Sequence, residues 1–77
     1  MTNYKAIVTF QDGTHRILRM TRDLVAKFVT LFRKMQRNPY KELYAWNTSG
    51  DEYMLLNGID SVKFIDEYRG VEFLTVS

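Results

Sequence analysis

The sequence contains no cysteine, and it has one proline, one tryptophan and one histidine in 77 residues. The absence of cysteine excludes disulfide bonds and thiolate chemistry. No run of apolar residues approaches the roughly 18 that a membrane-spanning helix requires, which excludes such a span. Nothing in residues 1–10 resembles a signal peptide, so we expect a cytoplasmic protein.

The motifs of common enzymes and cofactor sites are also missing. There is no Walker loop, no Gly-x-Gly-x-x-Gly and no Gly-x-Ser-x-Gly. His15 is the one candidate general base, and Asp12 with Ser49 or Ser61 would have to join it through tertiary contacts. An exposed histidine at a strand end is the more frequent outcome. The scattered carboxylates match no zinc or calcium spacing, so we expect no catalytic residue, no cofactor and no metal site.

Length and composition predict one folded domain. The chain is shorter than a typical domain of roughly 100–200 residues, and we expect residues 1–77 to form a single domain. With 45% hydrophobic and 26% charged residues, the composition is typical of globular proteins and unlike that of disordered ones.

Charge is distributed unevenly along the chain. Residues 1–41 contain nine Lys or Arg against two Asp, a net +7, whereas residues 42–77 contain two against seven Asp or Glu, a net −5. This polarity is compatible with a basic binding face, with head-to-tail self-association, or with two halves that neutralise each other.

The N-terminal segment predicts a β-hairpin. Residues 4–10 and 14–20 are rich in β-branched and aromatic residues and flank Asp12-Gly13. We expect a three-residue turn with a bulge, with Gly13 or its neighbour in the left-handed region, which pairs Val8 with Leu18. The shared apolar face would consist of Tyr4, Ala6, Val8, Phe10, Leu18 and Met20.

A helix is predicted from Arg22 to about Arg37. Thr21 is a suitable N-cap, while Asn38 as a left-handed terminator and Pro39 end the helix. At 100° per residue, the apolar side chains fall within an arc of roughly 160° and every charged side chain lies outside it. The helix is therefore amphipathic.

Four strands are predicted in the second half, where the hydrophobic period changes to two. They lie near residues 42–48, 52–56, 60–66 and 71–76. The order ββα followed by four strands indicates an α+β domain, with a mostly antiparallel sheet and one amphipathic helix packed on one face.

Turn chemistry sets the expected pairing of these strands. A type I′ turn at Asn57-Gly58 pairs Tyr53 with Val62, and a four-residue loop after the next strand pairs Asp66 with Val71. The apolar face then consists of Tyr53, Leu55, Val62, Phe64, Val71 and Phe73.

The opposite sheet face is unusually apolar for a solvated antiparallel sheet. One helix covers only one face, and so small a domain gains stability from further burial. We therefore expect a homo-oligomer. The predicted self-association face consists of Ile7, Ile17, Met54, Leu56, Ile65, Leu74 and Val76.

A basic surface is the second candidate site, and it consists of Arg16, Arg19, Arg22, Lys27, Arg33, Lys34 and Arg37. Phosphate backbones attract such a set through counterion release. The same residues also have a structural explanation. The helix dipole favours cations in the last turn, and Asp23 with Lys27 is an ordinary i,i+4 pair.

Aromatic residues near the third predicted strand are candidate stacking contacts. Tyr44 and Trp46 share one face of that strand, and Tyr40 precedes it. Leu43 and Ala45 on the other face are smaller. We therefore expect Tyr44 and Trp46 to point into the core.

The sequence as a whole predicts a non-enzymatic protein-interaction module that self-associates through its sheet. Its protein partner would bind the basic side of the helix or an uncovered sheet edge, and no membrane partner is expected. The alternative is a nucleic-acid-binding accessory protein that uses the basic helix and the adjoining strand.

Overall fold

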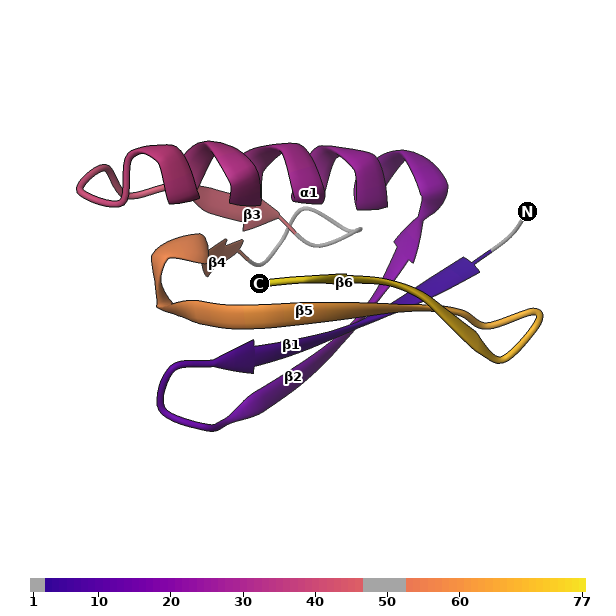
Figure 1. Ribbon diagram of the computed structural model, residues 1–77. Helices are drawn as coiled ribbons and strands as arrows, with labels where there is room; N and C mark the ends of the chain where they lie inside the picture. The colour runs from indigo at the N-terminus through magenta and orange to yellow at the C-terminus, as the bar shows by residue number, and fades with distance from the viewer. Residues whose placement is uncertain (1–2, 47–52) are drawn as a thin grey trace.

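A four-stranded antiparallel sheet carries one long helix and a two-stranded ribbon on the same side (Figure 1). The computed structural model describes residues 3–46 and 53–77. The elements are β1 (Asn3–Phe10), β2 (His15–Thr21), α1 (Arg22–Arg37), β3 (Tyr44–Trp46), β4 (Tyr53–Leu55), the 3-10 turn η1 (Leu56–Gly58), β5 (Ile59–Asp66) and β6 (Val71–Val76). The sheet order is β2-β1-β5-β6, with β3-β4 as the ribbon. The predicted α+β class, with one helix and a mostly antiparallel sheet, is confirmed.

The hairpin of β1 and β2 has the expected turn length but a different register. Gly13 adopts a left-handed φ of 88°, and its N–H donates to the carbonyl of Phe10 at 2.9 Å. Val8 pairs with Arg16 instead of with Leu18, because the glycine is the last of the three loop residues rather than the middle one. A shift of two residues leaves every side chain on its predicted face.

The helix begins and ends close to the predicted residues. The Thr21 hydroxyl accepts the Leu24 N–H at 3.4 Å, which satisfies one free amide of the first turn. Asn38 ends the helix with φ at −140°, so the expected left-handed conformation is wrong, and its N–H donates to the carbonyl of Lys34 at 3.3 Å. The described part of the chain contains no helix with the length and hydropathy needed to cross a membrane.

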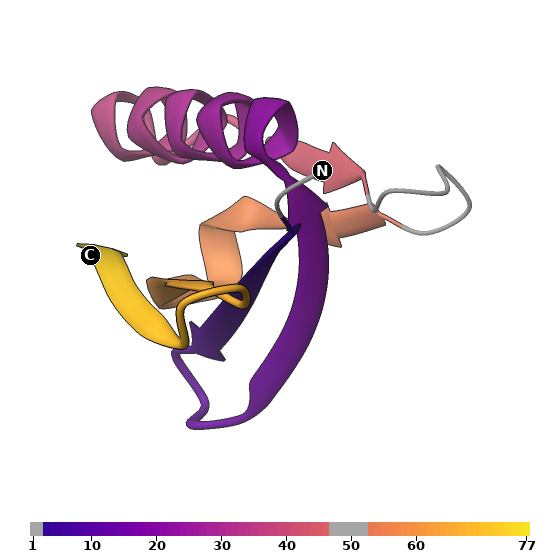
Figure 2. The ribbon, with the colours of Figure 1, turned by 90° about the vertical axis from the view of Figure 1, so that its right-hand side faces the viewer.

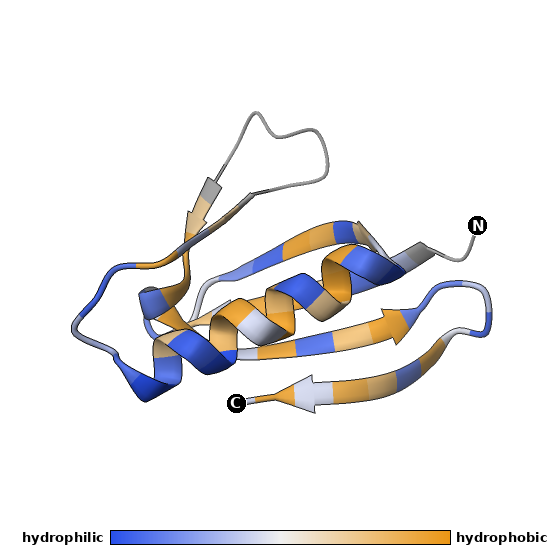
Figure 3. Cartoon of the chain, turned by 90° about the horizontal axis from the view of Figure 1, so that it is seen from above, coloured by the Kyte–Doolittle hydropathy of each residue, from blue (hydrophilic) through white to orange (hydrophobic). Residues whose placement is uncertain are grey.

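The core lies between α1 and the sheet, which curves beneath the helix with β2 at one edge and β6 at the other (Figure 2). Seen from above, the helix lies over the strands, and hydrophilic and hydrophobic residues alternate along it (Figure 3). The Phe28 and Phe64 rings meet edge to face at 6.2 Å and join the two layers. The helix buries Val25, Phe28, Phe32 and Met35 against a sheet surface that includes Ala6, Val8, Met20, Val62, Phe64 and Val76.

The pairing expected at Asn57-Gly58 is wrong. Tyr53 lies opposite Trp46 in the β3-β4 ribbon, and β4 forms no ladder with β5, so Tyr53 does not meet Val62. Residues 56–58 form a 3-10 turn in place of a type I′ hairpin. The parts of the third and fourth predicted strands within residues 47–52 lie outside the described residues.

A bulge changes the facing of β6. Asp66 pairs with Val71 as expected, but the register then shifts, so that Phe64 lies opposite Leu74 and Phe73 is the extra residue. A one-residue slip moves all following side chains to the other face of a strand. Of the expected apolar face, Val62 and Phe64 are buried, whereas Leu55, Val71 and Phe73 are exposed and the Tyr53 side chain is outside the described residues.

Candidate functional site

The solvent side of α1 carries five exposed cations, which we call the basic face: Arg22, Lys27, Arg33, Lys34 and Arg37. Within residues 3–46 and 53–77, none of the five forms an ion pair, and the pair expected between Asp23 and Lys27 is not formed. The helix dipole accounts for Lys34 and Arg37 in the last turn, but not for Arg22 or Lys27. Structural reasons therefore explain only part of the basic face.

None of the described acidic residues in the second half of the chain pairs with the basic face. Glu72 lies 3.8 Å from Lys63 on the neighbouring strand, and Glu42 accepts the Tyr44 hydroxyl at 2.9 Å. Asp66 and Glu67 lie at the turn between β5 and β6. Among the described residues, the acidic half of the chain leaves the basic face uncovered.

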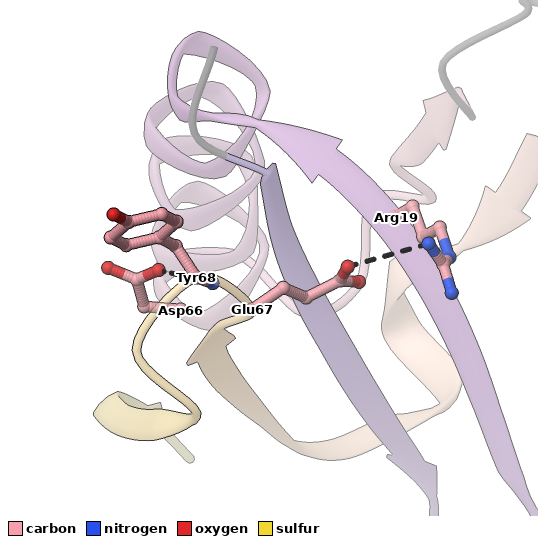
Figure 4. A network of polar contacts seen from close by, with 4 residues as sticks. All are labelled: Arg19, Asp66, Glu67 and Tyr68. Atoms are coloured by element: carbon pink, nitrogen blue, oxygen red, sulfur yellow. Dashed lines mark hydrogen bonds and ion pairs between the residues drawn. The ribbon is translucent and has the colours of Figure 1, made fainter.

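Arg19 is separated from the basic face. Alternation along β2 places Leu18 and Met20 toward the helix and Arg19 on the opposite side of the sheet. There its Nη1 lies 3.4 Å from Glu67 Oε2, an interaction that crosses over β1 (Figure 4). Arg16 is half-buried on β2 and has partners of its own. The seven cations predicted as one surface are thus divided: five lie on α1, and Arg19 lies on the far side of the sheet. The reason is that side chains alternate between the two faces of a strand.

Asn57 holds the loop between α1 and β3. Its Oδ1 accepts the Leu43 N–H at 3.0 Å, and its Nδ2 donates to the carbonyls of Pro39 at 2.9 Å and Lys41 at 3.0 Å. Sequence reasoning assigned this asparagine to a hairpin turn and missed its role, since its partners lie 14 to 18 residues away. No local pattern marks such a long-range contact.

The aromatic candidates have three different environments. Tyr40 is 97% exposed, in the loop that Asn57 holds. Tyr44 is 40% exposed, and Ala45 is buried instead, so the expected core position of Tyr44 is wrong. Leu43 and Ala45 both pack on the core. Because side chains alternate along a strand, Tyr44 between them points outward. The Trp46 side chain lies outside the described residues.

The predicted self-association face is divided between the two sides of the sheet. Met54, Leu56 and Val76 are buried, and Leu74 packs against the core, so their assignment to the far face is wrong. The bulge at Phe73 directs the side chains of Leu74 and Val76 toward the helix. Strand β4 pairs with β3 instead of joining the main sheet, so Met54 does not lie on the far face of that sheet. The face away from α1 keeps three of the predicted residues: Ile7, Ile17 and Ile65.

The possible catalytic residues are not assembled. His15 Nδ1 lies 3.1 Å from Thr9 Oγ1, whereas Asp12 Oδ1 accepts the N–H and hydroxyl of Thr14 at 3.0 and 2.6 Å. These Thr14 hydrogen bonds hold the pKa of Asp12 below its ordinary value of 3.8, so they support the turn at neutral pH and weaken as the pH falls through the lowered pKa. Ser49 lies outside the described residues, and Ser61 is half-buried on β5.

Within the described ranges, no group of three or more His, Asp or Glu is placed to hold a metal ion. The features that remain as candidate sites are therefore the basic face, the loop held by Asn57, and the isoleucines on the far side of the sheet. Comparison of the chain with protein-family models, with curated proteins and with solved structures gave no match.

Proposed function

We propose that this chain is a non-enzymatic module that binds nucleic acid through the basic face of α1. The observation that carries the proposal is the set of five exposed helix cations, none of them ion-paired within the described residues. Unpaired cations are available to neutralise phosphates and to release the counterions condensed on them. A protein-interaction role for the same surface is an outcome of the test below.

The dimensions of the helix suit this role. Its sixteen residues span about 24 Å at 1.5 Å per residue, and the cations extend from its first residue to its last. With Asp23 as its one acidic residue, the helix has a formal net charge of +4. Such a helix meets several phosphates at once.

Charge reversal on the helix tests the proposal. Replacing Arg33→Glu and Arg37→Glu together is expected to weaken binding and to lower the slope of log affinity against log salt by about two. The measurement is the fluorescence anisotropy of labelled single-stranded DNA, duplex DNA and RNA, titrated at roughly 50 and 200 mM salt.

A matched control variant distinguishes the loss of contacts on α1 from the effect of a lower net charge of the whole protein. Lys63→Glu with Arg69→Glu gives the same change in net charge, away from α1 on β5 and the turn after it. We expect this variant to keep most of the affinity and the slope. Equal losses in both variants, or no wild-type binding at the lower salt, would contradict the proposal and favour an acidic protein surface as the partner.

Self-association is the second candidate function, now restricted to the sheet face away from α1. Ile17 is 59% exposed and lies directly opposite Ile7, and the helix and ribbon both lie on the other side of the sheet (Figure 1). Ile17→Lys is expected to shift an oligomer toward monomer in equilibrium sedimentation, because a charge at the interface opposes burial. Leu55→Lys, on the ribbon, should leave the oligomer intact. A wild-type monomer at micromolar concentration would rule this function out.

A further inference from the structure

The side chain of Tyr40 is 97% exposed, more than any other large hydrophobic residue described. No ring contact, hydrogen bond or ion pair involves this side chain among the described residues. An aromatic ring in this position contributes little to the stability of the fold, because almost all of its surface is in water in the folded protein.

The backbone that carries the ring is nevertheless fixed. The carbonyls on either side of Tyr40, those of Pro39 and Lys41, both accept hydrogen bonds from Asn57 Nδ2. The Lys41 N–H donates in turn to the carbonyl of Asn38 at 3.2 Å, which closes the loop. The backbone of such a loop is ordered before a ligand arrives, so binding has only the rotation of the Tyr40 side chain left to restrict, which lowers its cost in conformational entropy.

Positive charge continues from the helix into this loop. Arg37 ends α1 three residues before Tyr40, and the exposed Lys41 follows it directly. The loop that follows α1 projects beyond the end of the sheet (Figure 1). Its outer part and the end of the helix are coloured as hydrophilic (Figure 3). The exposed ring therefore has a cation on each side of it in the sequence.

We propose that the nucleic acid bound by the basic face is single-stranded and that Tyr40 stacks on one of its unpaired bases, an inference that rests on the proposed function. Bases in a duplex offer only their edges in the grooves, whereas unpaired bases offer the flat surface on which an aromatic ring stacks. Arg37 and Lys41 contact the phosphates that flank this base.

The rest of the chain offers a matched comparison. Tyr68 is 89% exposed but lies in the turn with Asp66, Glu67 and Arg69, whose formal net charge of −1 does not attract phosphate. Tyr40 and Tyr68 thus resemble each other in residue type and exposure and differ in the sign of the surrounding charge. Their substitution separates stacking at a defined site from a general contribution of surface tyrosines.

The test compares Tyr40→Ala, Tyr40→Phe and Tyr68→Ala by anisotropy with labelled oligo-dT, oligo-rU and a DNA duplex of equal length at roughly 50 mM salt. Tyr40→Ala is expected to weaken binding to both single strands by about 5-fold to 100-fold, the usual range for loss of one stacked base. Tyr40→Phe should retain the affinity because the ring remains, and Tyr68→Ala should bind like the wild type. Duplex affinity should be the same for all four proteins.

Two outcomes would overturn the inference, and they are distinguishable from failure of the proposed function. Wild-type affinity of Tyr40→Ala for single strands, or an equal loss on duplex, would remove Tyr40 as a stacking residue. Binding that still depends on Arg33 and Arg37 would then leave the basic face as a phosphate-binding surface. If the wild type binds none of the three probes, both the proposed function and the inference are wrong.

Discussion

Replacement of Phe64 by alanine is expected to lower the free energy of unfolding by about 3–5 kcal/mol. Phe64 is fully buried on β5, which pairs with both β1 and β6 at the centre of the sheet. Its ring lies 6.2 Å from that of Phe28 on α1 and 6.3 Å from that of Phe73. The substitution removes one of the contacts between the helix and the sheet and leaves a cavity at the centre of the core.

The loss is large relative to the whole domain. At roughly 0.05–0.15 kcal/mol per residue, a domain of this size has a total stability of about 4–12 kcal/mol. Urea denaturation followed by circular dichroism gives the measurement. Phe73→Ala is the control, because this phenylalanine on the adjacent strand is already 48% exposed and should cost about 1 kcal/mol. Equal destabilisation by the two substitutions would show that Phe64 is not the centre of the core.

Asn57→Ala is expected to destabilise the protein by about 2–3 kcal/mol, which is unusual for a half-buried polar residue in a short turn. The substitution removes the hydrogen bonds to Leu43 N–H and to the carbonyls of Pro39 and Lys41. The Leu43 N–H is partly buried, so it loses its acceptor without full access to water. Hydrogen exchange at the Leu43 amide should accelerate more than exchange in β1 or β5.

Asn57→Asp separates the two halves of this interaction. The aspartate keeps an acceptor for the Leu43 N–H but turns the donor toward Pro39 and Lys41 into a carboxylate oxygen that faces two carbonyls. We expect a stability between those of wild type and alanine at low pH, where the protonated acid supplies one donor, and a further loss at neutral pH. Wild-type stability of Asn57→Ala would show that other contacts hold the loop.

Local chemistry explains which elements were predictable. The helix from Arg22 to Arg37 follows from a capping threonine, a 3.6-residue apolar period and a proline after its end, all contained in consecutive residues. The glycine turn of the first hairpin is equally local. The cations of α1 could be placed on its solvent side because helical spacing alone determines which residues share a face.

The errors arose where distant parts of the chain compete for the same residues. Asn57-Gly58 has the composition of a hairpin turn, but Asn57 binds the loop before β3 and β4 pairs with β3 instead of with β5. The alternation of apolar residues along β6 does not indicate the bulge at Phe73. Each of these changes moves a whole strand face, so the predicted self-association face was divided between core and surface.

The sequence by itself determined the amphipathic helix, the α+β class and the segregation of charge, because each depends on residue type and short spacing. Only the tertiary structure decided that the described acids of the second half leave the basic face uncovered, that Arg19 lies behind the sheet with Glu67, and that an exposed Tyr40 is carried on a hydrogen-bonded loop. These properties depend on which strands pair and in which register. That choice balances buried area and satisfied hydrogen bonds over the whole domain, and no single segment contains it.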